Sequence, residues 1–112
     1  MTRTRSAVAE SNPLEMFDRA AELFRVMAAP MRLRVINALC DGEKNVSELL
    51  ERIETTQPNM SQHLSMLYTA GVLSKRREGA QIYYSIADKK IVNLCKAICL
   101  HVADDSDFWT SP

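Results

Sequence analysis

The chain has 112 residues, of which 46% are hydrophobic and 25% charged, and its formal net charge is zero. These values fit a soluble globular domain, and there is no run of 18 apolar residues to span a membrane. A neutral total gives no support to nucleic-acid binding, so the local distribution of charge has to decide. Three cysteines and no apolar signal segment argue against a disulfide framework, and we expect a cytoplasmic protein.

Two helices are predicted in the first part of the domain, after a flexible tail over residues 1–11. The domain itself is expected over residues 12–103. The first helix begins near Pro13, with Asn12 or Ser11 as its N-cap. Pro30 interrupts the helical pattern, because the residue before a proline avoids the α region. A second helix is expected from about Met31 to Cys40.

A helix-turn-helix is predicted in the middle of the chain. Asn45 caps a helix from Val46 to about Glu54, with Glu48 as its capping-box partner. A three-residue turn leads to a second helix, capped by Thr56. Two short helices joined in this way are typical of DNA-binding proteins.

The outer face of that second helix is polar and uncharged. Met60, Leu64 and Leu67 recur at helical spacing and predict a buried stripe. The other faces carry the candidate DNA-binding residues Gln57, Asn59, Ser61, Gln62, His63 and Ser65. Amide and hydroxyl groups suit base edges and phosphates, and a merely solvated helix would usually carry Glu and Lys instead.

A β-hairpin is predicted next, with strands at residues 72–77 and 81–86 and a turn at residues 78–80. A hairpin directly after a helix-turn-helix indicates a wing. Its candidate DNA contacts are Lys75, Arg76, Arg77 and Gln81, whose cations would make affinity depend on salt. The alternative is an edge hairpin protected by its charges.

A last helix is predicted from about Lys89 to Ala103. Its apolar side comprises Ile91, Leu94, Cys95, Ile98 and Val102, with Cys99 at the edge. No later element covers this side, so the first helix, through Phe17, and the last helix predict a homodimer interface, which fits a palindromic operator. Residues 104–112 are expected to be an acidic tail, in which Phe108 and Trp109 either dock on the partner or fray.

The predicted fold is therefore mainly α with a small β-hairpin, a winged helix-turn-helix of four helices, two strands and a final helix. Four segments make the chain resemble the ArsR/SmtB family of winged-helix repressors: residues 28–34 (Ala-Ala-Pro-Met-Arg-Leu-Arg), 45–49 (Asn-Val-Ser-Glu-Leu), 57–64 (Gln-Pro-Asn-Met-Ser-Gln-His-Leu) and 76–84 (Arg-Arg-Glu-Gly-Ala-Gln-Ile-Tyr-Tyr). The resemblance covers about residues 17–102. It implies a homodimer that binds double-stranded operator DNA and releases it when an inducer is sensed.

The resemblance also points to sensor sites that this chain lacks or has altered. Many members bind a metal or metalloid through thiolates in the helix before the recognition helix, and residues 46–53 hold no cysteine. Zinc-sensing members place ligands along the last helix, where only His101, Asp104 and Asp105 remain. The branch that senses persulfide bridges one thiol in the second helix and one in the last. Those thiols align with Asn37 and a position near Ala103, so Cys40 lies about one turn later and Cys99 about one turn earlier.

Three interpretations of Cys40, Cys95 and Cys99 stay open. In the first, Cys40 and Cys99 (or Cys95) form a disulfide or polysulfide bridge, the direct form needing Cα atoms within roughly 7 Å. In the second, all three thiolates bind a soft metal or metalloid ion such as arsenite. In the third, all three are small apolar residues of the core.

An enzyme is not expected, because His63 and His101 are the only histidines and there is no glycine-rich phosphate loop or paired-cysteine zinc motif. A winged helix that serves only protein contacts is the alternative from another class. Repression and anti-repression are not distinguished by the sequence.

Overall fold

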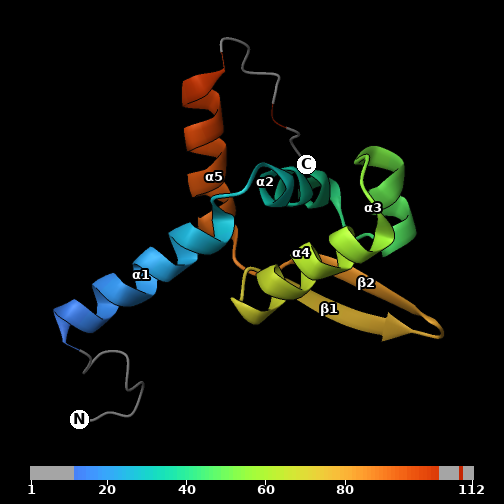
Figure 1. Ribbon diagram of the computed structural model, residues 1–112, viewed down its shortest axis with the longest axis horizontal. Helices are drawn as coiled ribbons and strands as arrows, with labels where there is room; N and C mark the ends of the chain where they lie inside the picture. The colour runs from blue at the N-terminus through green and yellow to red at the C-terminus, as the bar shows by residue number, and fades with distance from the viewer. Residues whose placement is uncertain (1–11, 104–108, 110–112) are drawn as a thin grey trace.

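The computed structural model describes residues 12–103 and Trp109 (Figure 1). Its helices are α1 (Pro13–Met27), α2 (Pro30–Ala38), α3 (Val46–Arg52), α4 (Gln57–Thr69) and α5 (Lys89–Val102), and a 3₁₀ turn, η2 (Leu39–Asp41), follows α2. Strands β1 (Leu73–Glu78) and β2 (Gln81–Ile86) form an antiparallel hairpin. This is the predicted fold. Within the described ranges, no helix has the length and apolar character that a membrane crossing requires.

Side-chain caps fix where the helices begin, as predicted. The Asn12 side chain accepts a hydrogen bond from the Glu15 N–H at 2.8 Å. The Asn45 and Glu48 side chains each accept from the other's backbone N–H at 2.9 Å, which completes a capping box. The Thr56 hydroxyl accepts from the Asn59 N–H at 3.2 Å. Each cap satisfies one of the N–H groups that a helix start leaves without a partner.

Several predicted boundaries differ from the observed ones by one or two residues. The second helix ends as an α-helix at Ala38, so Cys40 lies in η2 rather than in α2. The third helix ends two residues early, because Ile53 is extended (φ −126°, ψ 119°) and places its side chain in the core. The first strand runs to Glu78, one residue further than predicted, so the turn consists of Gly79 and Ala80 only, and Gly79 supplies its positive φ of 64°.

Helix α4 lies in the middle of the core. Met60, Leu64 and Leu67 are fully buried, as their spacing predicts. They pack in one cluster with residues of α2, α3 and the start of β1, among them Val35, Ile36, Leu49, Val72 and Leu73. Since this cluster takes one face of α4, the opposite face is left to solvent.

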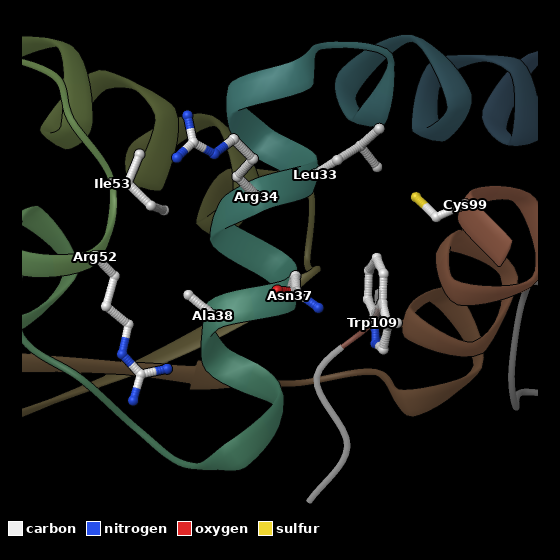
Figure 2. Close-up of a pocket in the computed structure, with 8 residues that line it drawn as sticks. All are labelled: Leu33, Arg34, Asn37, Ala38, Arg52, Ile53, Cys99 and Trp109. Carbon is white, nitrogen blue, oxygen red and sulfur yellow. The ribbon is translucent and has the colours of Figure 1, made fainter. Parts of the chain in front are cut away.

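Two contacts tie distant parts of the chain to this core. Lys44, in the loop before α3, exchanges two backbone hydrogen bonds with Tyr84 of β2, at 3.0 and 2.8 Å, and so attaches the hairpin to the helices. Trp109 is buried in the core cluster, between α2 and α5 (Figure 2). The expectation that Trp109 docks on a partner or frays is therefore wrong. The predicted tails, residues 1–11 and the rest of 104–112, lie outside the described residues.

Candidate nucleic-acid interface

The polar face of α4 is accessible along its length. Gln57, Asn59, Ser61, Gln62 and Ser65 are all exposed, as a DNA-reading helix requires. They project from a helix whose first turn is fixed by the Thr56 cap and by Pro58. The surface is therefore a set of neutral donors and acceptors on a rigid support.

The wing closes one side of this surface. A groove of about 390 Å³ separates the start of α4 from the hairpin, and its walls include Gln57 and Ser61 of α4, Gln81 and Tyr84 of β2, and Ser47 of α3. Three of the predicted DNA-binding residues, Gln57, Ser61 and Gln81, thus meet at one polar groove although 24 residues separate the first from the last. Figure 1 shows α4 beside the base of the hairpin.

The three wing cations are not equivalent. Arg76 donates to Glu43 at 2.6 and 2.9 Å and to Glu78 at 2.8 Å, and it stacks on the Tyr83 ring. These two carboxylates raise the pKa of Arg76 and neutralise its charge. Sequence reasoning grouped Arg76 with its neighbours and missed Glu43, which lies 33 residues away in sequence.

Lys75 and Arg77 lie on the other face of the strand, because successive side chains alternate. Arg77 donates to the Gly79 carbonyl at 3.1 Å, and Lys75 lies over the ring of Tyr68 on α4, 4.3 Å from its centroid. Neither cation is ion-paired with a carboxylate among the residues that the structure describes. Their charge is therefore directed to the α4 side of the wing.

His63 differs from the other predicted contacts on α4. It is half-buried, and its Nδ1 lies 3.3 Å from Nη1 of Arg32 on α2. Burial and the Arg32 charge both lower the pKa of His63 below its ordinary value. Arg32 belongs to residues 28–34, one of the segments that resemble the ArsR/SmtB family, and no local sequence pattern predicts its contact with His63.

Helix α5 carries two apolar stripes, which the sequence analysis merged into one. Val92 and Cys95 are buried in the protomer, and Ile91 is half-buried against its core. Cys95 donates to the Met27 sulfur at 3.5 Å, so the prediction that Cys95 lies in a dimer interface was wrong. Ile91, also predicted there, packs partly against the core of its own protomer. The outer stripe, Leu94, Ile98 and Val102, is 39%, 50% and 78% exposed.

Helix α1 exposes a matching apolar surface. Leu14, Phe17 and Phe24 are 76%, 70% and 52% exposed. A pocket of about 210 Å³ lies between α1 and α5, with Phe24, Leu94 and Ile98 among its walls. Both helices extend from the same end of the molecule, opposite the tip of the wing (Figure 1).

The three cysteines are free thiols, and Cys95 and Cys99 line the pocket between α1 and α5. Cys40 is half-buried and donates to the Ile36 carbonyl at 3.3 Å. Burial raises its pKa, while the Trp109 N–H opposes that rise. Burial, with the Cys99 and Cys40 charges, raises the pKa of Cys95 to about 11. Cys99 is half-buried and faces a cavity of about 290 Å³ that Trp109 also lines (Figure 2).

Comparison with known proteins adds the family. Residues 29–75 match the model of "Bacterial regulatory protein, arsR family". The chain is 34% identical to the HTH-type transcriptional repressor SmtB of Mycobacterium tuberculosis, over 84% of this chain and 70% of that one. It is 34% identical to a probable mercury resistance operon repressor of Streptomyces lividans, over 80% and 71%. The solved transcriptional repressor BigR of Xylella fastidiosa superposes with a TM-score of 0.71 at 30% identity, over 85% and 100%.

The family match agrees with the structure, in which α4 exposes a polar face beside the wing. The relatives are DNA-binding transcriptional repressors and not enzymes, as expected from the sequence. The chain belongs to the ArsR/SmtB family of bacterial regulatory proteins.

Proposed function

We propose that this protein is a homodimeric repressor that reads a palindromic operator with α4 and the wing and leaves it when Cys40 and Cys99 are modified by reactive sulfur species. The observation that carries the DNA-binding part is the exposed, uncharged face of α4, which shares a polar groove with Gln81 of the wing. Amides on such a face suit adenine edges in the major groove.

Phosphate contact falls to the cations that are not neutralised within the protomer. Lys75 and Arg77 have no carboxylate partner among the described residues and lie on the α4 side of the hairpin, so they flank the reading face. Arg76 is held by Glu43 and Glu78 and contributes little net charge there. Lys75 and Arg77, two of the three predicted wing cations, therefore remain the phosphate contacts.

Dimerisation is proposed through the outer stripe of α5 and the exposed side of α1. A helix with apolar groups on two faces needs two partners, and the core of the protomer supplies one. A second copy of the chain supplies the other, because a two-fold dimer places the same surface on both subunits. The interface residues are then Phe17, Leu94, Ile98 and Val102.

The cysteine arrangement favours sulfur chemistry over the alternatives. Cys95 is buried in the core, which leaves the half-buried Cys40 after α2 and Cys99 on α5 as the more accessible pair. One thiol near the second helix and one in the last helix is the arrangement of the persulfide-sensing branch that the sequence resembles. The mercury-related relative supports a soft-metal alternative. Against it, the described residues include no group of three or more Cys, His, Asp or Glu side chains placed to bind a metal.

DNA binding is tested by selecting duplexes from a random library with the purified protein. We expect an inverted repeat, and we expect Gln62→Ala to lose about tenfold in affinity for it, since a good bidentate base contact is worth about 1–3 kcal/mol. Thr69→Ala, at the far end of the same helix, is the control. Failure of the wild-type protein to enrich any duplex would contradict the proposal and favour a protein-interaction module.

The inducer is tested by mass spectrometry and operator affinity after treatment with sodium tetrasulfide or with arsenite. A cross-link that joins Cys40 to Cys99 and accompanies DNA release supports the sulfur proposal. A stoichiometric arsenic adduct supports the metalloid alternative. Unchanged release in the Cys40→Ser and Cys99→Ser variants would show that these cysteines are structural.

A further inference from the structure

Arg32 joins three elements through one guanidinium group. Its Nε donates to the Val26 carbonyl in the last turn of α1. Its Nη1 lies 3.3 Å from the Nδ1 of His63 and 3.2 Å from the sulfur of Met66, both on α4. Arg32 itself belongs to the first turn of α2 and is half-buried.

The contact with α1 satisfies a group that the helix cannot satisfy itself. Val26 is one of the last four residues of α1, whose carbonyl oxygens have no N–H partner within the helix. Val26 is also 4% exposed, so water has little access to the residue. A buried carbonyl without a donor is destabilising, and a charged donor is a strong remedy.

The contact with α4 falls beside its DNA-facing side. His63 follows Gln62 directly, and Met66 follows Ser65, and both Gln62 and Ser65 are exposed reading residues. A rotation of α4 about its own axis would move all four side chains together. The planar guanidinium group of Arg32 contacts α1 through Nε and α4 through Nη1, and these two contacts oppose that rotation.

We propose that Arg32 is a positioning residue for operator binding, which fixes the angle of the recognition helix relative to α1, the helix assigned to the dimer interface. The inference rests on the proposed function, since it takes α4 as the DNA-reading element. Arg32 does not touch DNA in this account. It transmits the geometry of the dimer to the reading surface.

The contact between Arg32 and His63 requires a neutral imidazole. A neutral imidazole accepts a hydrogen bond from Arg32, whereas a protonated one has no acceptor and repels the guanidinium. Of the charged groups that the structure describes on the packed helices, only Arg32 shifts the pKa of His63. The Glu22–Arg25 pair of α1 lies at the neighbouring groove beside Met66 and neutralises itself. Acidification therefore opens the Arg32–His63 contact.

The pH dependence has a definite sign. Because the pKa of His63 is lowered on folding, the protein loses stability as pH falls below 6.5, the ordinary histidine value, and regains it at higher pH. Operator affinity is expected to fall over the same range. If His63 instead met a phosphate, protonation would add a favourable charge and affinity would rise.

The test compares the wild-type protein with Arg32→Lys, Arg32→Met and His63→Gln on one labelled duplex selected by the wild-type protein. Arg34→Met is the matched control, because Arg34 lies two residues further along α2 and is exposed. Affinity is measured between about pH 8 and about pH 5, the range in which histidine titrates, and over a range of salt. Circular dichroism and sedimentation report folding and dimerisation, and Arg32→Lys keeps the side-chain stem should Arg32→Met unfold.

We expect both Arg32 variants to lose about tenfold in affinity at the higher pH with dimerisation unchanged, as expected for a charge-assisted hydrogen bond. The slope of affinity against salt should stay the same, and the acid-dependent loss should be absent from His63→Gln. Wild-type affinity in both Arg32 variants, or a rise of wild-type affinity in acid, would overturn the inference. A shallower salt slope would overturn it too, since it would identify Arg32 as a direct phosphate contact. Failure of the wild-type protein to select any duplex would instead contradict the proposed function.

Discussion

The cations of the wing show how far one residue's role depends on its neighbours. Lys75, Arg76 and Arg77 are consecutive in the chain and all exposed, yet among the described residues only Arg76 meets carboxylates, those of Glu43 and Glu78. A charge already balanced within the protomer contributes little to phosphate attraction. Residue type and exposure therefore do not decide which cation binds DNA.

Arg77→Gln is expected to weaken operator binding and to reduce the slope of log affinity against log salt by roughly one for each phosphate that is no longer neutralised. Arg76→Gln should change that slope much less, because its charge is neutralised by Glu43 and Glu78. Fluorescence anisotropy over a range of salt measures both slopes. Equal slope changes for the two variants would show that the Glu43–Arg76 pair opens on DNA.

Cys95 is the most deeply buried of the three thiols. Its pKa is raised to about 11 by burial, from an ordinary value of 9.0, so at neutral pH it is a protonated thiol and a poor nucleophile. Iodoacetamide should therefore modify Cys99 before Cys95 in the native protein, as peptide mass spectrometry can follow. The Cys95 thiol ionises at a lower pH in the unfolded chain than in the folded protein. Its contribution to folding stability is therefore fully present below pH 9.0 and is lost as pH rises towards 11. Fast alkylation of Cys95 at neutral pH would contradict this account.

At the scale of elements, the spacing of apolar residues is a good predictor of which segments form helices. It is a poorer predictor of which face each helix buries. Capping residues placed the starts of α1, α3 and α4 correctly, since a cap acts within three residues of itself. The buried face of α4 was also predicted, because Met60, Leu64 and Leu67 recur at helical spacing along one side of the helix. Helix α5 is apolar around more of its circumference, so its spacing alone could not separate the buried Cys95 from the exposed Ile98.

The remaining misses are contacts between distant parts of the chain. Lys44 with Tyr84, Arg32 with His63, and Arg76 with Glu43 each join residues that no local pattern relates. Trp109 was assigned to a tail because the segment around it is polar and acidic, although a single large aromatic side chain is enough to fill a gap between two helices. Only the folded arrangement supplies these pairs.

The two faces of α5 give a prediction at the same scale. Ile98→Glu, on the outer stripe, should convert the dimer to a monomer with little loss of helix content, because in the dimer it buries an unpaired charge. Cys95→Ser, on the inner stripe, should lower the melting temperature and leave the dimer intact. Sedimentation equilibrium and thermal melts separate the two effects. A dimer that survives Ile98→Glu would place the interface elsewhere.

The molecule as a whole is extended rather than compact. Its radius of gyration is 15.7 Å, against about 13 Å for a compact domain of 100 residues. Helices α1 and α5 extend from one end of the molecule (Figure 1), and their exposed apolar residues favour assembly with a second copy.

Trp109 packs in the core cluster that α2 and α5 contribute to. Trp109→Ala should lower the free energy of unfolding by about 3 kcal/mol, because it removes a large side chain that is 5% exposed. Denaturant unfolding followed by circular dichroism measures the loss, with Ile82→Ala, at an exposed position of the wing, as the control. Equal unfolding curves for wild-type protein and Trp109→Ala would show that the indole does not occupy the core in solution.

The central claim is that α4 and the α4-facing side of the wing form the surface that meets DNA. Hydrogen exchange measured by mass spectrometry, with and without the selected duplex, tests it on the intact protein. The account predicts new protection over residues 57–66 and 75–82, and none over residues 92–102, where the dimer is already formed. Protection confined to α1 and α5, with residues 57–66 unchanged by the duplex, would contradict it.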